Sequence, residues 1–144
     1  MVALDLYNAI NTRFKQSARL VRSLRRCYFG VASEADRDYL PCVLVHIDET
    51  EDLSTYDEEV RRFTVDFEIR TKVRTPQAAS EAIRYLQAMF DNVEFDASSL
   101  SLSGWNRNPQ GGETPTSEGG VYKARVQYDV IAASRAKSPA FEKR

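Results

Sequence analysis

Metal-binding and disulfide-forming residues are scarce in this sequence. Its 144 residues include two cysteines, Cys27 and Cys42, and one histidine, His46. A zinc site needs several such ligands, and the cysteines do not form a Cys-x-x-Cys pair, so the sequence argues against bound zinc. We expect both cysteines to be reduced thiols and the protein to need no cofactor.

Long apolar runs are also missing. No stretch approaches the roughly 20 consecutive apolar residues that span a membrane. The first residues, MVALDLYNAINTRF, lack the basic segment and following apolar segment of a signal peptide. We therefore expect a protein that has no membrane partner and that is made and stays in a cytoplasm, or leaves it only by lysis.

A catalytic centre is not marked by any motif. Asp66 and Glu68 stand two residues apart on one face of a predicted strand, but paired carboxylates on a sheet surface are usually solvated. His46 has no serine, cysteine or carboxylate partner marked by sequence. Residues 48–59 lack the spacing of an EF-hand, and the glycine-rich residues 106–120 lack a phosphate-binding motif. We expect no enzyme and no metal site.

Charge is nearly balanced overall, at −1, but it is unevenly distributed along the chain. Residues 6–33 contain no acid, and residues 48–59 contain no base. Such blocks are commonly solvated, and the alternative is a pair of complementary patches within one chain or between neighbouring copies. The candidate contact residues are Arg19, Arg22, Arg25 and Arg26 in the basic block, and Glu49, Glu51, Asp52, Asp57, Glu58 and Glu59 in the acidic block.

The clearest periodic signal lies in residues 63–73, where apolar and polar side chains alternate. One parity carries Phe63, Val65, Phe67, Ile69, Thr71 and Val73. The other carries Thr64, Asp66, Glu68, Arg70 and Lys72. Because successive side chains of a strand point to opposite faces, this pattern predicts a long strand with one apolar and one charged face. It is typical of an antiparallel sheet whose apolar face is covered by another layer.

Three further strands and two helices complete the expected fold. Apolar β-branched residues predict a strand over residues 39–47, and alternation predicts a closing strand over 121–132. The closing strand is a candidate partner for a broken strand region that ends near Trp105. Thr75 and Pro76 open a helix that runs to residue 90. A first helix over residues 3–26 is predicted by an apolar stripe of Leu6, Ile10, Phe14, Ala18, Val21 and Leu24.

Together these elements predict one α+β domain over residues 1–132, followed by a polar C-terminal arm at 133–144. The expected order is α-β-β-α-β-β. Two amphipathic helices would cover one face of a four-stranded, mainly antiparallel sheet, which makes a two-layer fold. Residues 48–59 and 106–120 would be exposed loops.

This order of segments resembles the tail-terminator, or tail-completion, proteins of the head–tail junction in long-tailed bacteriophages. The resemblance covers about residues 3–132 and lies in the order, length and texture of the segments. The matching segments are the first helix, YLPCVLVHI, RRFTVDFEIRTKV, TPQAASEAIRYLQAMF, a glycine-rich stretch and VYKARVQYDVIA.

The resemblance implies a structural virion protein with no catalytic residues. Members of that family form a hexameric ring on the last ring of the tail tube, stop tube growth and offer a surface to head-completion, or neck, proteins. The implied partners are further copies of this chain, the tail tube protein and a neck protein, with a tail sheath as an additional candidate. DNA would meet the chain only as it passes through the ring lumen. The implied location is the virion tail or neck, after assembly in the host bacterial cytoplasm.

A ferredoxin-like module that binds a ligand or nucleic acid is the alternative. Its binding surface would combine the basic first helix with Tyr122 and Tyr128. RNA-binding sheets display exposed aromatic side chains. These two tyrosines have the parity of the expected core face, which argues against the alternative.

Overall fold

The computed structural model describes residues 2–24, 26–29, 41–56, 58–72, 77–91, 100–108, 115–118 and 121–134. These residues form three helices and six strands. In chain order the elements are α1 (Val2–Lys15), α2 (Ala18–Leu24), β1 (Arg26–Phe29), β2 (Cys42–Asp52), β3 (Val60–Lys72), α3 (Gln77–Phe90), β4 (Leu100–Arg107), β5 (Thr116–Glu118) and β6 (Val121–Ser134).

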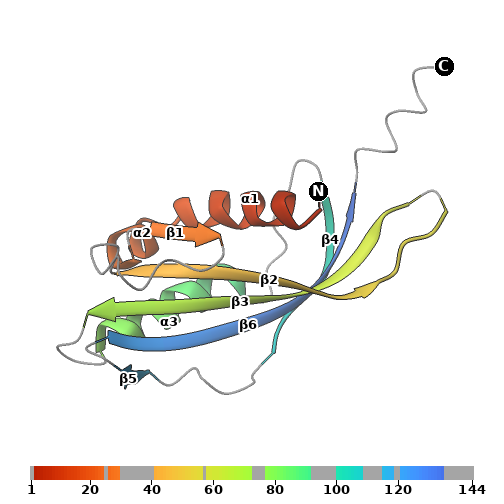
Figure 1. The fold of residues 1–144 in the computed structure, drawn as a ribbon. Coiled ribbons are helices and arrows are strands. Elements are labelled where there is room, and N and C mark those ends of the chain that lie inside the picture. The colour runs from red at the N-terminus through yellow and green to blue at the C-terminus, as the bar shows by residue number, and fades with distance from the viewer. Residues whose placement is uncertain are drawn as a thin grey trace.

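The strands form one mixed sheet in the order β1-β2-β3-β6-β4, and β5 pairs with the start of β6 (Figure 1). β1 runs parallel to β2, whereas the other described pairs are antiparallel. The predicted α+β class is confirmed. The prediction of four strands is wrong, because β1 and β5 join the sheet as short edge segments. Four and three residues are too few for an alternating pattern to emerge from the sequence.

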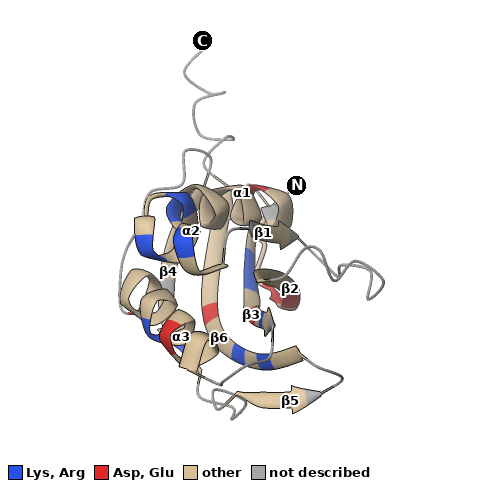
Figure 2. Ribbon diagram, turned by 90° about the vertical axis from the view of Figure 1, so that its left-hand side faces the viewer, with Lys and Arg blue, Asp and Glu red and all other residues tan. Residues whose placement is uncertain are grey.

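The long central strands follow the predicted alternation. The apolar parity of β3 is buried at Phe63, Val65, Phe67 and Ile69. Its partner β6 buries Ala124, Val126, Tyr128, Val130 and Ala132. These side chains form one core with apolar residues of all three helices, so the helices cover this face of the sheet. α2 also packs against α3, as the side view in Figure 2 shows.

The predicted first helix is two helices rather than one. A turn at Gln16 and Ser17 separates them, and the Ser17 hydroxyl accepts a hydrogen bond from the Leu20 N–H at 3.2 Å. Serine is a favoured N-cap because its side chain satisfies an N–H group that has no partner inside the helix. The break also shifts the apolar stripe. Leu20 and Leu24 are buried, whereas the expected Ala18 and Val21 are exposed.

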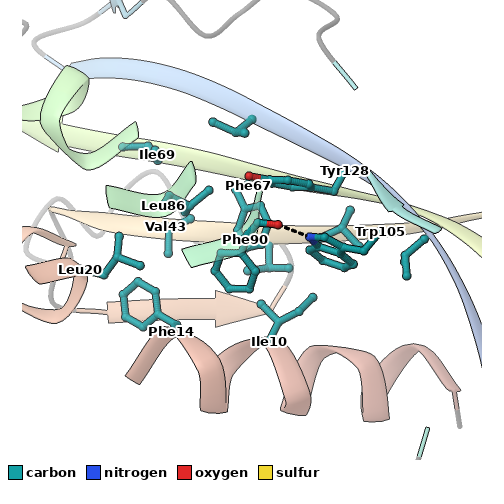
Figure 3. Close-up of a cluster of buried hydrophobic side chains, with 14 of the residues drawn as sticks. Ile10, Phe14, Leu20, Val43, Phe67, Ile69, Leu86, Phe90, Trp105 and Tyr128 are labelled. Atoms are coloured by element: carbon teal, nitrogen blue, oxygen red, sulfur yellow. Dashed lines mark hydrogen bonds between the residues drawn. The ribbon is translucent and has the colours of Figure 1, made fainter. Parts of the chain in front are cut away.

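Four aromatic side chains occupy the centre of the core (Figure 3). The rings of Trp105 and Tyr128 stack with centroids 5.1 Å apart, and those of Phe67 and Phe90 lie 4.9 Å apart. The Trp105 indole N–H donates a hydrogen bond to the Phe90 carbonyl at 2.6 Å. Trp105 belongs to β4, where a bulge lies between Ser103 and Asn106. This bond ties β4 to the end of α3 inside the apolar layer.

The β2–β3 hairpin extends past the body of the domain (Figure 1). β2 is buried over its first four residues and exposed from Asp48 onward. The strands continue to Leu53 and Val60, where the Leu53 N–H donates to the Val60 carbonyl at 2.8 Å. We call residues 48–62 the hairpin arm. The sequence predicted a solvated hairpin connection over residues 48–59. The structure confirms the hairpin and its exposure, but residues 48–52 belong to β2, so the connection is shorter than predicted.

Several expected features lie partly or wholly outside the described residues. Thr75 and Pro76, the expected start of α3, are among them. The expected 106–120 loop contains the end of β4 and the whole of β5, and the expected 133–144 arm begins with the last two residues of β6. Within the described chain, no helix has the length and apolar character needed to cross a membrane.

Candidate interaction site

The sheet face opposite the helices is polar and hollowed. The alternation of β3 and β6 directs polar side chains to this face, whereas β2 contributes the buried Cys42 and Leu44 before its polar residues begin at His46. The strand register aligns His46 with Asp66 and Glu68 with Arg125. β5 adds Thr116 at one side. Together they form a hollow of about 490 Å³, which we call the open-face pocket. It is lined by His46, Asp48, Asp66, Glu68, Thr116, Lys123, Ala124 and Arg125.

Asp66 is the buried charge of this pocket. The residue is 3% exposed, although it lies on the parity predicted to be solvated. The Arg125 guanidinium donates a hydrogen bond to its Oδ2 atom, and this bond and the charge of Asp66 raise the pKa of Arg125. No donor among the described residues reaches Oδ1. A buried acceptor without a donor typically costs about 1–3 kcal/mol, so Asp66 is held at a cost to stability.

Glu68 connects two basic side chains on the same face. The Arg70 Nε–H donates to one carboxylate oxygen at 2.7 Å, and His46 Nε2 lies 3.1 Å from the other. Burial raises the pKa of Glu68, but the Arg70 bond and charge, with a smaller contribution from His46, bring it below its ordinary value. The sequence reveals no carboxylate partner for His46, because the two residues are 22 positions apart and meet only through the β2–β3 register.

The described lining of the open-face pocket is mostly charged. It contains carboxylates, an imidazole, an ammonium, a guanidinium and the Thr116 hydroxyl, and none of these described residues is a serine or a cysteine. Among the described residues, no group of three or more histidine, cysteine, aspartate or glutamate side chains could hold a metal ion. Paired and unpaired charges at an open surface are suited to a charged side chain of another macromolecule.

The predicted acidic residues of the hairpin arm largely pair within the chain. Arg61 lies 2.6 Å from Glu49, 3.1 Å from Glu59 and 3.9 Å from Asp52. Arg62 lies 3.4 Å from Glu51. Glu58 is exposed, and Asp57 lies outside the described residues. The sequence signal for this pairing is the Arg61–Arg62 dipeptide, which directly follows the acidic residues 48–59. In a hairpin, these two arginines lie across from the acidic residues of β2.

The electrostatics of the arm are those of exposed pairs. Hydrogen bonds from Ser54 lower the pKa of Asp52, and the Glu49 hydrogen bond raises the pKa of Arg61. Solvent screens such pairs, so they contribute little to stability. The arm still has a formal charge of −5, since seven acidic side chains face two arginines. It therefore remains an acidic surface.

The predicted basic residues lie on the other side of the domain. Arg19 and Arg22 are exposed on α2, which carries basic side chains and no acidic ones (Figure 2). The Arg19 guanidinium lies 5.7 Å from the centre of the Tyr85 ring. Arg25 and the side chain of Arg26 lie outside the described residues. Because α2 belongs to the helical layer, Arg19 and Arg22 lie on the side of the sheet opposite the open-face pocket.

The aromatic surface that the nucleic-acid alternative needs is largely absent from the described residues. Tyr128 is fully buried in the core, and Tyr122 is half-buried. Tyr56 is fully exposed on the hairpin arm, surrounded in sequence by acids. Such surroundings repel a phosphate backbone rather than attract one.

The fold was compared with solved structures, and the sequence with protein-family models and curated proteins. No protein-family model matches the sequence, and no curated protein matches it. A solved structure with a similar arrangement is the bacteriophage SPP1 gp17 protein. It is 14% identical over 85% of this chain and 86% of that chain, with a TM-score of 0.45.

Proposed function

We propose that this chain is a structural protein of a long-tailed phage virion that forms a hexameric ring on the end of the tail tube. In that position it ends tube growth and joins the tail to the neck. The proposal assigns it no catalytic activity. It follows from the resemblance of the sequence segments to tail terminators, and those segments contribute most of the helices and strands of the fold.

The observation that supports the proposal best is the separation of charge on the folded molecule. The hairpin arm is acidic and projects from the body, whereas α2 exposes Arg19 and Arg22. The two surfaces are different parts of one chain. Contact between unlike surfaces of identical subunits is heterologous, and a heterologous contact closes into a ring when its rotation is suitable.

The proposed subunit contacts are the predicted charged residues. The basic residues Arg19, Arg22, Arg25 and Arg26 of one copy would meet the arm residues of the next copy, namely Glu49, Glu51, Asp52, Asp57, Glu58 and Glu59. The remaining partners are the tail tube protein, a neck protein and, as a further candidate, a tail sheath. DNA would pass through the lumen of the ring.

The experiment that tests this function is native mass spectrometry with negative-stain imaging over a range of protein and Mg²⁺ concentrations, with and without purified tail tubes. We expect six-fold rings, either free or on tube ends. Reversing Arg22, Arg25 and Arg26 to glutamate should abolish them, and Arg84→Glu on the exposed surface of α3 is the matched control. A chain that forms no ring and binds no tube end contradicts the proposal.

A further inference from the structure

The open-face pocket contains an acceptor atom that no described side chain satisfies. Asp66 is 3% exposed, and only its Oδ2 atom receives a hydrogen bond from Arg125. Its Oδ1 atom is buried and lacks a donor within the described part of the chain. An ionised carboxylate can accept hydrogen bonds only, so the missing partner must present an N–H or O–H group.

The surroundings of Asp66 favour a cationic partner. Asp48 lines the same pocket and is exposed. Asp48 is also the first residue of the hairpin arm, so the acidic surface continues from the arm into the pocket. Lys123 and Arg125 lie at the opposite side of the pocket, and Arg125 is already engaged by Asp66. A guanidinium fits this set, because its several N–H groups can serve two carboxylates at once.

The chain itself presents such a group on its opposite side. Arg22 is exposed on α2, in the helical layer, whereas the pocket opens on the other face of the sheet. A copy cannot place its own Arg22 in its own pocket. A neighbouring copy can, and a contact between helical layer and open sheet face is heterologous, as a ring requires.

We propose that the open-face pocket receives the Arg22 guanidinium of a second copy of this chain, with the Oδ1 atom of Asp66 as its acceptor. Because this atom has almost no accessible surface in the single chain, the Asp66 side chain must turn toward the pocket when the contact forms. The inference rests on the proposed ring and names the site at which two subunits engage. It places the strongest subunit contact at the base of the hairpin arm rather than along it, because most described acids of the arm already pair with Arg61 or Arg62.

The test is a double-mutant cycle on self-association, measured by native mass spectrometry and sedimentation. Asp66→Asn and Arg22→Gln should each weaken ring formation by about tenfold or more, because each leaves the other charge unpaired. The double variant should self-associate at least as tightly as the single variant that associates less tightly. Asp129→Asn, on the same sheet face, and Arg84→Gln, on α3, are matched controls that should leave association unchanged.

A second measurement covers the case in which Asp66→Asn disturbs folding. Arg22→Cys combined with Lys123→Cys retains Asp66 and should give a ladder of disulfide-linked chains on mild oxidation. Arg84→Cys with Lys123→Cys, and the unaltered chain with its own two thiols, are the controls. If the wild type forms rings and neither single variant weakens their formation, the pocket contact is wrong and the proposed ring still stands. A chain that neither associates nor cross-links at its highest soluble concentration overturns the contact as well.

Discussion

At the scale of single residues, polar groups inside the apolar layer determine how the core is oriented. Tyr128 is fully buried, yet its hydroxyl donates a hydrogen bond to the Asp91 carboxylate at 2.6 Å. Asp91 also lies 3.5 Å from Arg107 of β4. These contacts join β6, β4 and the end of α3. Apolar packing alone is non-directional, so such bonds favour one arrangement of the three elements.

Tyr128→Phe tests the value of this bond. The ring and its stacking remain, but the Asp91 carboxylate loses a donor, so we expect the free energy of unfolding to fall by about 1–2 kcal/mol. Urea denaturation measures it. Tyr85→Phe, at a half-buried position of α3, is the control and should change stability by less than about 0.5 kcal/mol. Equal effects of the two variants would contradict the role assigned to the bond.

Tyr7 and Cys27 give the fold a dependence on alkaline pH. Burial, with the neighbouring Cys27, raises the pKa of Tyr7 to about 12. Burial also raises the pKa of Cys27 to about 12, despite the opposing hydrogen bond from Tyr7. Both groups are therefore favoured in their neutral forms in the folded state. Their contribution is complete below the ordinary values of 9.0 and 10.0, and it is lost as pH rises toward about 12.

The measurement is urea denaturation at several pH values from neutral to strongly alkaline. The wild type should lose stability more steeply above pH 9 than the Tyr7→Phe, Cys27→Ala double variant, which has neither group to ionise. Lysine and arginine residues titrate equally in both proteins, so the difference between the two curves isolates the pair. Parallel curves would refute the assignment.

At the scale of elements, the break between α1 and α2 illustrates how one side chain redirects the chain. The Ser17 hydroxyl accepts from Leu20, and the Ser17 carbonyl accepts from the Val21 N–H at 3.0 Å. The new helix then turns Leu20 and Leu24 into the core and leaves Arg19 and Arg22 exposed. The cap therefore stabilises the start of α2, the helix that supplies part of the core and exposes Arg19 and Arg22.

Ser17→Ala removes the cap without changing the backbone. We expect a loss of about 1 kcal/mol in unfolding free energy, since an N-cap serine typically contributes this much. Gln16→Ala, at the exposed neighbouring position, is the control and should be close to neutral. Chemical denaturation of both variants decides the point. A neutral Ser17→Ala would mean that packing of Leu20 and Leu24 alone holds α2.

At the scale of the whole molecule, the hairpin arm is separated from the parts that stabilise the domain. None of the described residues 49–62 belongs to the buried core. β3 has 13 residues and buries apolar side chains only from Phe63 onward, so its first residues are free for the subunit contact that we propose. Loops and projections of this kind carry function on a rigid scaffold.

Shortening the arm separates stability from assembly. Replacing residues 54–59 by Asn-Gly would join Leu53 and Val60, which already pair, through a two-residue turn. We expect the thermal midpoint to change little, since the deletion removes only one described bond to the body, from Ser134 N–H to the Glu59 carbonyl. Ring formation or binding to tube ends should weaken, because the deletion removes Asp57, Glu58 and Glu59 from the proposed contact and leaves the contact at the base of the arm in place. The uncut chain with Tyr56→Ser is the control for the loop surface. A shortened chain that assembles normally would remove the arm from the proposed interface.

The sequence predicted the helices and strands whose pattern of apolar and polar residues repeats over many positions. β3 and β6 alternate over more than ten residues, and α3 carries a wide apolar stripe, so their faces follow from chain geometry alone. The same reasoning missed β1, whose four residues pair with a strand more than ten positions away. It also missed the break at Ser17, because Ala18 and Val21 continue an apolar stripe that the folded chain does not use.

The charged residues separate what the sequence determines from what the tertiary structure determines. Composition determined that acids and bases occupy different stretches, and alternation determined that Asp66 and Glu68 share a polar face. Only the strand register brings His46 to Glu68, Arg125 to Asp66 and Arg61 to Glu49. The physical reason is that alternation depends on local backbone geometry, whereas a charge pair depends on which distant strand lies alongside, and a shift of one residue would exchange every partner.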